Sequence, residues 1–376
     1  MKNSQKGNIM ELEDIFPKDK IRNLPDSDWR HRMMFDAKPE VSEIRGCVIR
    51  LLSFAERQGI VDNEMLSRLG SDDYEQFRSA IHELAVAEFL SPIGNINWHP
   101  LGRNLRVGEF EIKPTNHEPI FVEVKTIFES PDEQREERNW DVLREIAHNI
   151  PSPFRIWVEF LKLQHEVVPG HFRPWLKRQI SDLREELTDL YQERELIFAD
   201  TFDDGSVIEV KVKFVRIESD GLPTACDLWC GVRQVELHER VKEVIDGALE
   251  QLPDNQPTLV VVASTAWVGL DKVGMLAAMF SFPKLTYYRG IAPIKQKETI
   301  HYDMEGIVQK SIRTRVSAVG VWHQKWAKDP QGALDVYHNP LAARQLSHHV
   351  LELPNVCQLI PKDERTMEWT PNRPSE

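Results

Sequence analysis

A glutamate and a lysine stand two residues apart inside an apolar segment that runs from Pro119 to Ile127. The segment is typical of a β-strand, in which alternate side chains point to the same face. Glu123 and Lys125 therefore share one face, and Val122 and Val124 point to the opposite face, into a core. Charges buried in an apolar strand are costly unless they have partners. A bound metal ion would neutralise carboxylates there and make their burial tolerable.

A second acidic group is expected on the strand that precedes the turn-like residues 114–118. Two strands joined by such a turn form a β-hairpin, which brings Glu109 close to Glu123. Glu111 lies on the same strand face as Glu109 and is the alternative partner, and we favour Glu109. The hairpin therefore predicts two carboxylates and one ammonium group in a single cluster.

A further carboxylate comes from the helix predicted before the hairpin. Apolar residues recur at helical spacing over residues 74–89, after an N-terminal signal at residues 71–73. Glu83 lies in this helix and is the candidate to complete the cluster. Glu88 points away from Glu83 and is expected to be structural, and His82 is expected to be a surface or packing residue.

Strands and helices alternate along the rest of the chain. Further helices are predicted over residues 42–58, 131–149, 175–198 and 235–252, and further strands over residues 95–99, 105–112, 154–163, 206–217, 258–263 and 316–322. The polar residues 1–40 predict an extended arm or a partly ordered lead-in. This interleaving favours an α/β or α+β fold with a mixed sheet.

The predicted cluster resembles the site of the PD-(D/E)xK, or restriction-endonuclease-like, nuclease superfamily. In that family an acidic residue near the start of one strand is followed by E-x-K on the next strand. A helix upstream often carries a glutamate. This chain has Glu109, then Glu123 and Lys125, with Glu83 upstream. The order of helix, strand, hairpin, helix and strand is more specific than the tripeptide alone.

The resemblance covers residues 71–130, and the helix and strand over residues 235–263 are compatible with the later half of the fold. The chain departs from the family at the first motif, where Gly108 and Glu109 replace the usual Pro-Asp. The implied architecture is a restriction-endonuclease-like core with a central mixed sheet flanked by helices, plus a helical N-terminal region. Domains are expected at residues 1–70 (arm and helical region), 71–350 (nuclease-like domain with insertions) and 351–376 (C-terminal tail).

The resemblance also implies a mechanism. Glu109 and Glu123, with the backbone carbonyl of Val124, would hold Mg²⁺ or Mn²⁺, hard cations that prefer oxygen ligands. Such an ion lowers the pKa of a bound water and stabilises charge on phosphate. Lys125 would orient or help deprotonate that water, and Glu83 would orient a metal-bound water or hold a second ion. The implied catalytic set is Glu83, Glu109, Glu123 and Lys125.

Each of these residues also has a plain structural interpretation. Glu123 and Lys125 are alternatively an exposed charge pair on a solvated sheet face, and Glu109 and Glu111 are alternatively another such face. Glu83 is alternatively a residue on the surface of its helix. A metal site instead requires that the side chains are buried and converge in space.

The chain is acidic overall, with 60 Asp and Glu residues against 47 Lys and Arg residues among 376. This negative net charge argues against a protein that binds nucleic acid through its overall charge, because phosphate binding needs Lys and Arg. A local basic excess with interleaved tyrosines lies between residues 284 and 315. We predict nucleic-acid contacts from Lys295, Lys297, Lys310, Arg313 and Arg315. An ordinary solvated loop and helix is the alternative.

The expected compartment is the cytoplasm. The four cysteines do not form a disulfide-rich pattern, and the N-terminus has no apolar run suited to a signal peptide. The most apolar stretch, residues 258–282, is interrupted by charges. It predicts a buried strand followed by a helix, and no contact with a membrane.

The sequence thus predicts a Mg²⁺-dependent nuclease that hydrolyses phosphodiester bonds in DNA, with a role in phage defence, restriction or repair. It would act as a homodimer or with a separate protein partner. One alternative is a catalytically degenerate restriction-endonuclease-like fold that binds nucleic acid or protein. Another is an interaction protein of unrelated α/β fold, in which the four charged residues do not converge.

Overall fold

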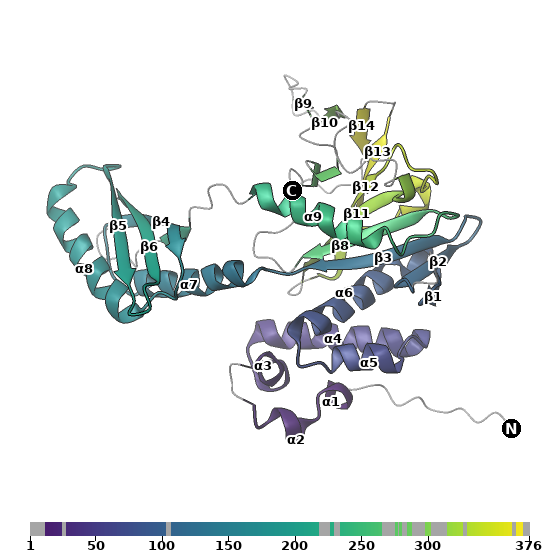
Figure 1. Ribbon diagram of the computed structural model, residues 1–376, viewed down its shortest axis with the longest axis horizontal. Coiled ribbons are helices and arrows are strands. Elements are labelled where there is room, and N and C mark those ends of the chain that lie inside the picture. Colours follow the sequence, from purple (N-terminus) through teal and green to yellow (C-terminus); the bar gives the residue numbers. More distant parts are fainter. Residues whose placement is uncertain are drawn as a thin grey trace. The chain divides into compact units, whose positions relative to one another are not determined.

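The chain divides into two compact units in the computed structural model (Figure 1). Unit 1 consists of Met1–Phe128 and Val235–Glu376, and unit 2 is Glu129–Gln234, inserted in the sequence of unit 1. The boundaries expected at residues 70 and 350 do not coincide with this division. The structure describes residues 12–24, 28–102, 107–217, 226–228, 234–264, 275–276, 278–279, 284–287, 298–301, 314–325, 329–362 and 366–370.

The described part of unit 1 before its first strand is helical. Asp62 and Asp73 each accept a backbone N–H at the start of a helix, and Gly59 ends another with a left-handed φ of 69°. Phe16 and Ile21 are buried, so the expected extended arm is wrong for the described residues. The helices are α1 (Leu12–Ile15), α2 (Lys18–Ile21), α3 (Trp29–Phe35), α4 (Pro39–Gln58), α5 (Asn63–Leu69) and α6 (Tyr74–Leu90), followed by the 3-10 turn η1 (Ser91–Ile93).

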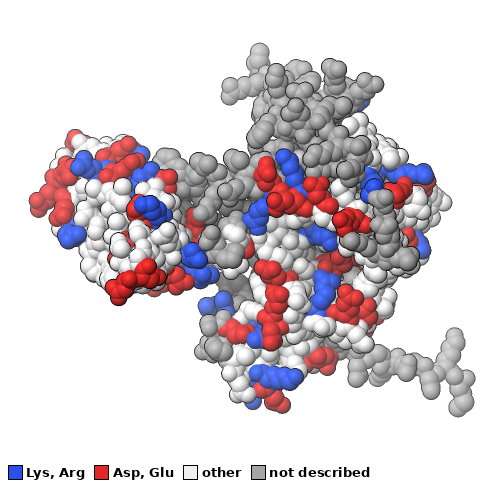
Figure 2. Space-filling view, viewed as in Figure 1, with Lys and Arg blue, Asp and Glu red and all other residues white. Residues whose placement is uncertain are grey.

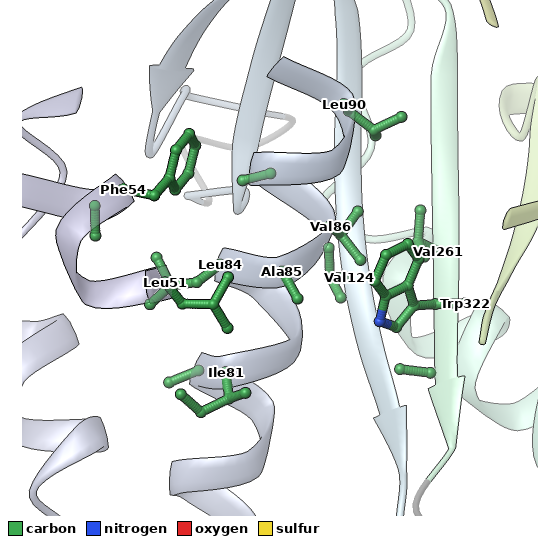
Figure 3. Packing of buried hydrophobic residues seen from close by; sticks show 14 of the residues in the cluster. Leu51, Phe54, Ile81, Leu84, Ala85, Val86, Leu90, Val124, Val261 and Trp322 are labelled. Carbon is green, nitrogen blue, oxygen red and sulfur yellow. The ribbon is translucent and has the colours of Figure 1, made fainter. Parts of the chain in front are cut away.

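Helix α6 lies between α4 and the sheet. Leu51 and Phe54 of α4 belong to the same core cluster as Val124 and Val261 of the sheet, and α6 packs between them (Figure 3). Residues 80–87 of α6 are all buried. A helix that is buried around its whole circumference belongs to the core of a protein. Any charged residue in this stretch is therefore buried with it and needs a partner.

A mixed sheet forms the centre of unit 1. The pairs β3–β8, β8–β11 and β12–β13 are parallel, and the other described pairs are antiparallel. The strands in spatial order are β1 (Gly94–Trp98), β2 (Phe110–Pro114), β3 (Ile120–Ile127), β8 (Thr258–Ser264), β11 (Ala318–Lys325), β12 (Asp329–His338), β13 (Val356–Pro361), β14 (Thr366–Trp369), β10 (Glu298–His301) and β9 (Lys284–Tyr287). Helix α9 (Gln234–Ala248) precedes β8, and the 3-10 turn η5 (His348–Leu351) precedes β13. The expected α/β class, with a mixed sheet flanked by helices, is confirmed.

The two faces of this sheet contribute to two separate cores. Val124 and Val261 point into the core formed with α4 and α6. Phe121 and Val260 point into the opposite core, formed with α9. This alternation is the one expected for strands buried on both faces. Glu123 pairs in register with Val260, so its side chain lies on the α9 face.

Unit 2 is a smaller α/β unit with its own core. Residues such as Val158 and Val210 point from its sheet toward Leu143 and Leu176 of two helices. The strand order is β5 (Glu193–Thr201), β6 (Val207–Arg216), β4 (Phe154–Leu163) and β7 (Cys226–Leu228), and the helices are α7 (Pro131–His148) and α8 (Pro169–Glu186). Strand β6 alternates buried and partly exposed residues. One face of this sheet is therefore buried and the other is accessible.

The predicted helix over residues 175–198 is confirmed as far as Glu186 and wrong beyond it. Helix α8 ends at Glu186, the chain turns where Tyr191 takes a positive φ of 64°, and β5 then pairs along β6. Cross-strand pairing outweighs the helix-favouring charges of this segment. Strand β2 begins at Phe110, later than expected. The other predicted strands and helices are present with shifted ends, except that residues after Ser264 in the stretch 258–282 are only partly described.

Among the helices of the described residues, none combines the length and the apolar composition that crossing a membrane requires.

Candidate functional site

Strand β3 places Glu123 and Lys125 side by side on the face toward α9. Glu123 is fully buried, at 0% exposure, and Lys125 is partly buried. The Nζ of Lys125 lies 2.5 Å from Oε1 of Glu123 and donates a hydrogen bond to Oε1 of Gln251 at 3.3 Å. In register, Glu123 pairs with Val260 and Lys125 with Val262. The carboxylate of Glu123 therefore lies in an apolar interior and Lys125 reaches its partly exposed edge, so the solvated-face alternative is wrong for Glu123.

The carboxylate of Glu123 is incompletely satisfied. Lys125 forms an ion pair with Oε1, and no described residue gives either oxygen a hydrogen bond of ordinary geometry. Burial raises the pKa of Glu123, and the charge of Lys125, with weaker hydrogen-bond contacts from its side chain and from the backbone of Glu109, opposes this change. A buried carboxylate is costly unless it is both paired and hydrogen-bonded. Carboxylate oxygens that lack donors are suited to a hard divalent cation.

Glu109 comes immediately before β2 and is held there by backbone contacts. Its carbonyl accepts the N–H of His99 at 3.0 Å, and the N–H of Gly108 donates to the carbonyl of Pro100 at 2.9 Å. A Cβ atom on Gly108 would lie 2.1 Å from the ring of Phe121. Only glycine permits this approach of the backbone to the ring, so Gly108 determines where Glu109 enters the sheet.

The charge of Glu109 interacts with the other predicted residues. Burial raises the pKa of Glu109 well above its ordinary value, and the nearby Glu83 and Glu123 raise it further. Lys125 and Arg68 act in the opposite direction. Three carboxylates and two cations thus interact electrostatically and leave an excess of negative charge. Glu83 and Glu123 are buried and Glu109 is partly exposed, and the oxygens of the three carboxylates do not all lie within 4.8 Å of one another. Such clusters are characteristic of functional sites.

Glu111, the alternative to Glu109, is engaged elsewhere. Its Oε1 lies 3.2 Å from Nζ of Lys113, and its Oε2 accepts a hydrogen bond from Nε2 of Gln256 at 3.2 Å. The structure therefore brings Glu109, and not Glu111, into electrostatic contact with Glu123.

Helix α6 contributes Glu83, which is 3% exposed and is not a surface residue. Arg68 of α5 holds both of its oxygens: Nη1 donates to Oε2 at 2.7 Å, and Nη2 donates to Oε1. Bidentate guanidinium–carboxylate pairs are strong and directional. Burial alone would lower the pKa of Arg68, but Glu83, followed by Glu109, raises it. Arg68 therefore neutralises and orients Glu83 in the cluster.

Lys125 keeps its proton in this arrangement. Burial alone would lower the pKa of Lys125, but the surrounding carboxylates, led by Glu123, raise it above its ordinary value. A protonated ammonium group donates hydrogen bonds and attracts anions, and it does not accept a proton. Of the two roles expected for Lys125, orientation and charge stabilisation fit the structure better than direct deprotonation of water.

The backbone of Val124 faces the segment that carries Glu109. The N–H of Phe121 donates to the carbonyl of Pro257, on the β8 side of β3. Alternate residues direct their N–H and C=O groups to opposite edges of a strand, so Val124 directs its carbonyl to the β2 side. The pairing of β3 with β2 ends at Val122. The carbonyl of Val124 is thus directed toward the place where a cation bound by Glu109 would lie.

His82 and Glu88 have structural roles. His82 is buried, and its Nδ1 lies 3.0 Å from Oγ1 of Thr126 in β3. Burial lowers the pKa of His82 well below its ordinary value, so the ring is neutral and packs between α6 and β3. Glu88 forms an ion pair with Arg50 of α4.

The predicted nucleic-acid contacts are only partly placed. Arg315 is described, and its Nε lies 2.6 Å from Oδ1 of Asp254 while its Nη1 donates to the carbonyl of Leu249. Acidic and basic side chains are intermixed on the described parts of the face that Figure 2 shows. The other four predicted contacts lie outside the described residues: Lys295, Lys297, Lys310 and Arg313.

Two residues of the cluster were not anticipated from the sequence. Arg68 binds Glu83 across 15 positions, and Gln251 binds Lys125 across 126 positions. No local spacing signals either contact, because both depend on packing between elements.

A separate group of metal-ligand side chains lies on η5. His348, His349 and Glu352 offer ligand atoms within 4.8 Å of one another, at the protein surface. The group contains none of the residues predicted from the sequence.

Comparisons of the chain with protein-family models, with curated proteins and with solved structures gave no significant match.

Proposed function

We propose that this protein is a metal-dependent nuclease of the PD-(D/E)xK type. The observation that carries the proposal is the fully buried carboxylate of Glu123, which has an ion pair with Lys125 but no hydrogen bond of ordinary geometry among the described residues. Glu109 and Glu83 interact electrostatically with it. The oxygens of Glu123 have few hydrogen-bond donors and lie among other negative charges. A divalent cation bound there would offset the cost of burying this charge.

The topology around the cluster supports the same proposal. Helix α6 is followed by the antiparallel strands β1, β2 and β3, then by α9 and by β8, which is parallel to β3. This order agrees with the restriction-endonuclease-like core that the sequence led us to expect. Unit 2 is then an insertion between β3 and α9.

Each residue of the cluster would have a separate role in catalysis. Glu109, Glu123 and the carbonyl of Val124 would hold Mg²⁺ or Mn²⁺, and Glu83, oriented by Arg68, would fix a water or a second ion. Lys125 remains protonated and donates to the scissile phosphate or to the attacking water. When bound, the metal supplies Lewis acidity and a lowered pKa of water. The surrounding core excludes bulk solvent from the carboxylates of Glu83 and Glu123.

The proposed substrate is DNA, and the proposed reaction is hydrolysis of phosphodiester bonds in defence, restriction or repair. The proposed contacts to the nucleic acid remain five basic residues: Lys295, Lys297, Lys310, Arg313 and Arg315. The protein would act as a homodimer or with a separate protein partner. The structure assigns Arg315 an ion pair with Asp254, so its share in binding would require that pair to open. Cys47 and Cys357 are buried and form no disulfide with a described residue, which suits the proposed reducing cytoplasm.

Cleavage assays test the nuclease proposal. Plasmid, single-stranded DNA and RNA are incubated with the protein in Mg²⁺ or Mn²⁺, with and without EDTA, and the products are separated on gels. We expect metal-dependent cutting of DNA by the wild type and none by Glu123→Gln. Cutting that persists in EDTA or in the folded Glu123→Gln variant contradicts the proposed site.

A second candidate function has one specific observation in its favour. Arg68 already binds both oxygens of Glu83, and Lys125 already pairs with Glu123, so two of the three carboxylates have cationic partners without metal. A catalytically degenerate member of the same fold that binds nucleic acid or protein would have this arrangement. Calorimetric titration separates the two functions, because the degenerate protein does not bind Mn²⁺ through Glu109 and Glu123.

A further inference from the structure

The N-terminal helices of unit 1 enclose a cavity of about 190 Å³. Its walls come from α3, α4 and α6, and it shares no lining residue with the carboxylate cluster on β2 and β3. The floor and one side are apolar, formed by Met33, Val41, Ile44 and Val48. Val48 is fully buried, and Ile44 and Val41 are partly exposed. The cavity is therefore open to solvent on the side of α4's first turns.

Aromatic rings form the other side of the cavity. Trp29 lies with its ring centre 4.6 Å from that of Phe77, at an interplanar angle of 35°. Tyr74 meets the same Trp29 ring at 5.4 Å in an edge-on arrangement. Phe16 also packs against Trp29 and Phe77, with ring centres 5.6 and 5.8 Å away, and Phe77 is buried. An aromatic occupant would therefore chiefly meet the partly exposed Trp29 and the exposed Tyr74, in the offset or edge-on arrangements that aromatic rings prefer.

A guanidinium group is part of the cavity wall. Arg78 of α6 lies over the Tyr74 ring at 5.8 Å, and its Nη2 lies 3.5 Å from Nε2 of His82. Because a guanidinium only donates, Nε2 of His82 accepts and its Nδ1–H donates to Oγ1 of Thr126 at 3.0 Å. These contacts fix Arg78 in place. Burial lowers the pKa of Arg78, so an anion close to it would be stabilised more strongly than in water.

A second cation stands at the cavity. Arg32 of α3 is about half exposed, and its Nε lies 3.9 Å from Oδ2 of Asp36. At that distance and exposure the Arg32–Asp36 pair is loose. The cavity thus combines an apolar, aromatic interior with two guanidinium groups.

We propose that this cavity is a binding site for a small aromatic carboxylate. An apolar cavity of about 150 Å³ accepts a benzene ring, so 190 Å³ accommodates one six-membered ring with a short acid chain. The ring stacks among Trp29, Phe77 and Tyr74, and the carboxylate pairs with Arg78. The proposal stands independently of the nuclease function, because none of these residues belongs to the metal cluster.

Calorimetry or ligand-observed NMR with phenylacetate tests the site in the full-length protein. We expect saturable binding at one site, with a Kd of about 1 mM or tighter for a ligand of this size. The amine of matched shape, 2-phenylethylamine, binds at least about tenfold more weakly, because it loses the charge-assisted contact. Equal binding of the acid and the amine overturns the proposal, and so does an absence of saturable phenylacetate binding.

Variants assign the binding to this cavity. Arg78→Met keeps an unbranched apolar stem and removes the guanidinium charge, and we expect it to weaken phenylacetate binding at least about tenfold. Arg57→Met, on the exposed side of α4 and outside the cavity, is the matched control and leaves binding unchanged. Ile44→Phe fills the cavity and abolishes binding without removing a charge. Thermal melting shows that each variant is folded, and unchanged binding by folded Arg78→Met and Ile44→Phe proteins contradicts the assignment.

Discussion

The same tripeptide, Glu-Val-Lys, occurs in a strand of each unit of this protein. In unit 1 it is Glu123 to Lys125 of β3, and in unit 2 it is Glu209 to Lys211 of β6. The two lysine side chains are similarly exposed, at 28% and 30%. The glutamates differ: Glu123 is 0% exposed and Glu209 is 27% exposed.

The two copies also differ in how charges are shared. On β6, each charge has its own partner on β4: Glu209 pairs with Lys162 at 2.5 Å, and Lys211 pairs with Glu159. On β3, Glu123 and Lys125 share their surroundings with two further carboxylates and one arginine. The unit 2 copy is a solvated ladder of exposed pairs, each of which contributes little to stability. A metal site thus requires a buried carboxylate and converging acids, which the tripeptide alone does not specify.

The largest expected effect comes from removing the lysine of the tripeptide in β3, with the lysine of the tripeptide in β6 as its control. Lys125→Met should lower the rate of the proposed metal-dependent DNA cleavage by about 1000-fold, because it removes the cation that we propose to face the phosphate. Lys211→Met should leave the rate unchanged. Initial rates of plasmid cleavage check this contrast. Circular dichroism verifies that each variant is folded. Equal losses in the two variants would remove the functional distinction between the two strands.

The next largest effect concerns the buried and the exposed ion pairs. Arg68→Met leaves Glu83 buried without its bidentate partner and should lower the free energy of unfolding by about 3 kcal/mol. Lys162→Met breaks the exposed pair with Glu209 and should cost under about 1 kcal/mol. Denaturant unfolding followed by tryptophan fluorescence measures both. Glu83→Gln in the Arg68→Met background should recover part of the loss, since it removes the unpaired charge.

Metal binding should stabilise unit 1 through the same carboxylates. Mn²⁺ or Mg²⁺ at 100 times its Kd should add about 2.7 kcal/mol to the free energy of unfolding of the wild type. The ion should add almost nothing to Glu123→Gln, whereas Glu209→Gln should respond like the wild type. Thermal melts with and without metal check this, and a metal response retained by Glu123→Gln would place the ion elsewhere.

The smallest effect is a gain in stability without metal, and it depends on pH. The pKa values of Glu109 and Glu123 are raised in the folded state, chiefly by burial, so folding favours their protonated forms. Stability from these groups is therefore greatest below their ordinary pKa of about 4 and falls as pH rises through the raised values. Glu123→Gln avoids this loss and should raise stability in EDTA at pH 7 by about 1 kcal/mol.

The pH dependence of that gain can be measured directly. The difference between Glu123→Gln and the wild type should widen from pH 4 to pH 7 in thermal melts in EDTA. A constant difference over this range would mean that Glu123 ionises normally.

Much of the cluster could be predicted because its signals are local. Alternation along β3 placed Glu123 and Lys125 on one face and Val124 on the other, and the structure agrees. The hairpin turn placed Glu109 near Glu123. Face alternation does not decide between Glu109 and Glu111, because strand β2 begins only at Phe110 and the alternation does not extend to the residue before it.

Other features depended on contacts that no local pattern carries. The charged segment over residues 187–198 favoured a helix, but pairing with β6 makes it a strand. The polar N-terminal segment suggested an arm, yet sparse apolar residues such as Phe16 and Trp29 suffice to dock it. Arg68 and Gln251 join the cluster through contacts over 15 and 126 positions, which no local pattern predicts.

By itself the sequence determined the alternating strands, the capped helices and the spacing of Glu123 and Lys125, because these follow from the periodicity of the backbone. The tertiary structure decided which Glu-Val-Lys is buried, since two faces of the unit 1 sheet are covered and one face of the unit 2 sheet is not. It also decided that Arg68 neutralises Glu83. Burial and charge pairing are properties of packed elements. They distinguish a candidate metal site from a solvated strand that carries the same tripeptide.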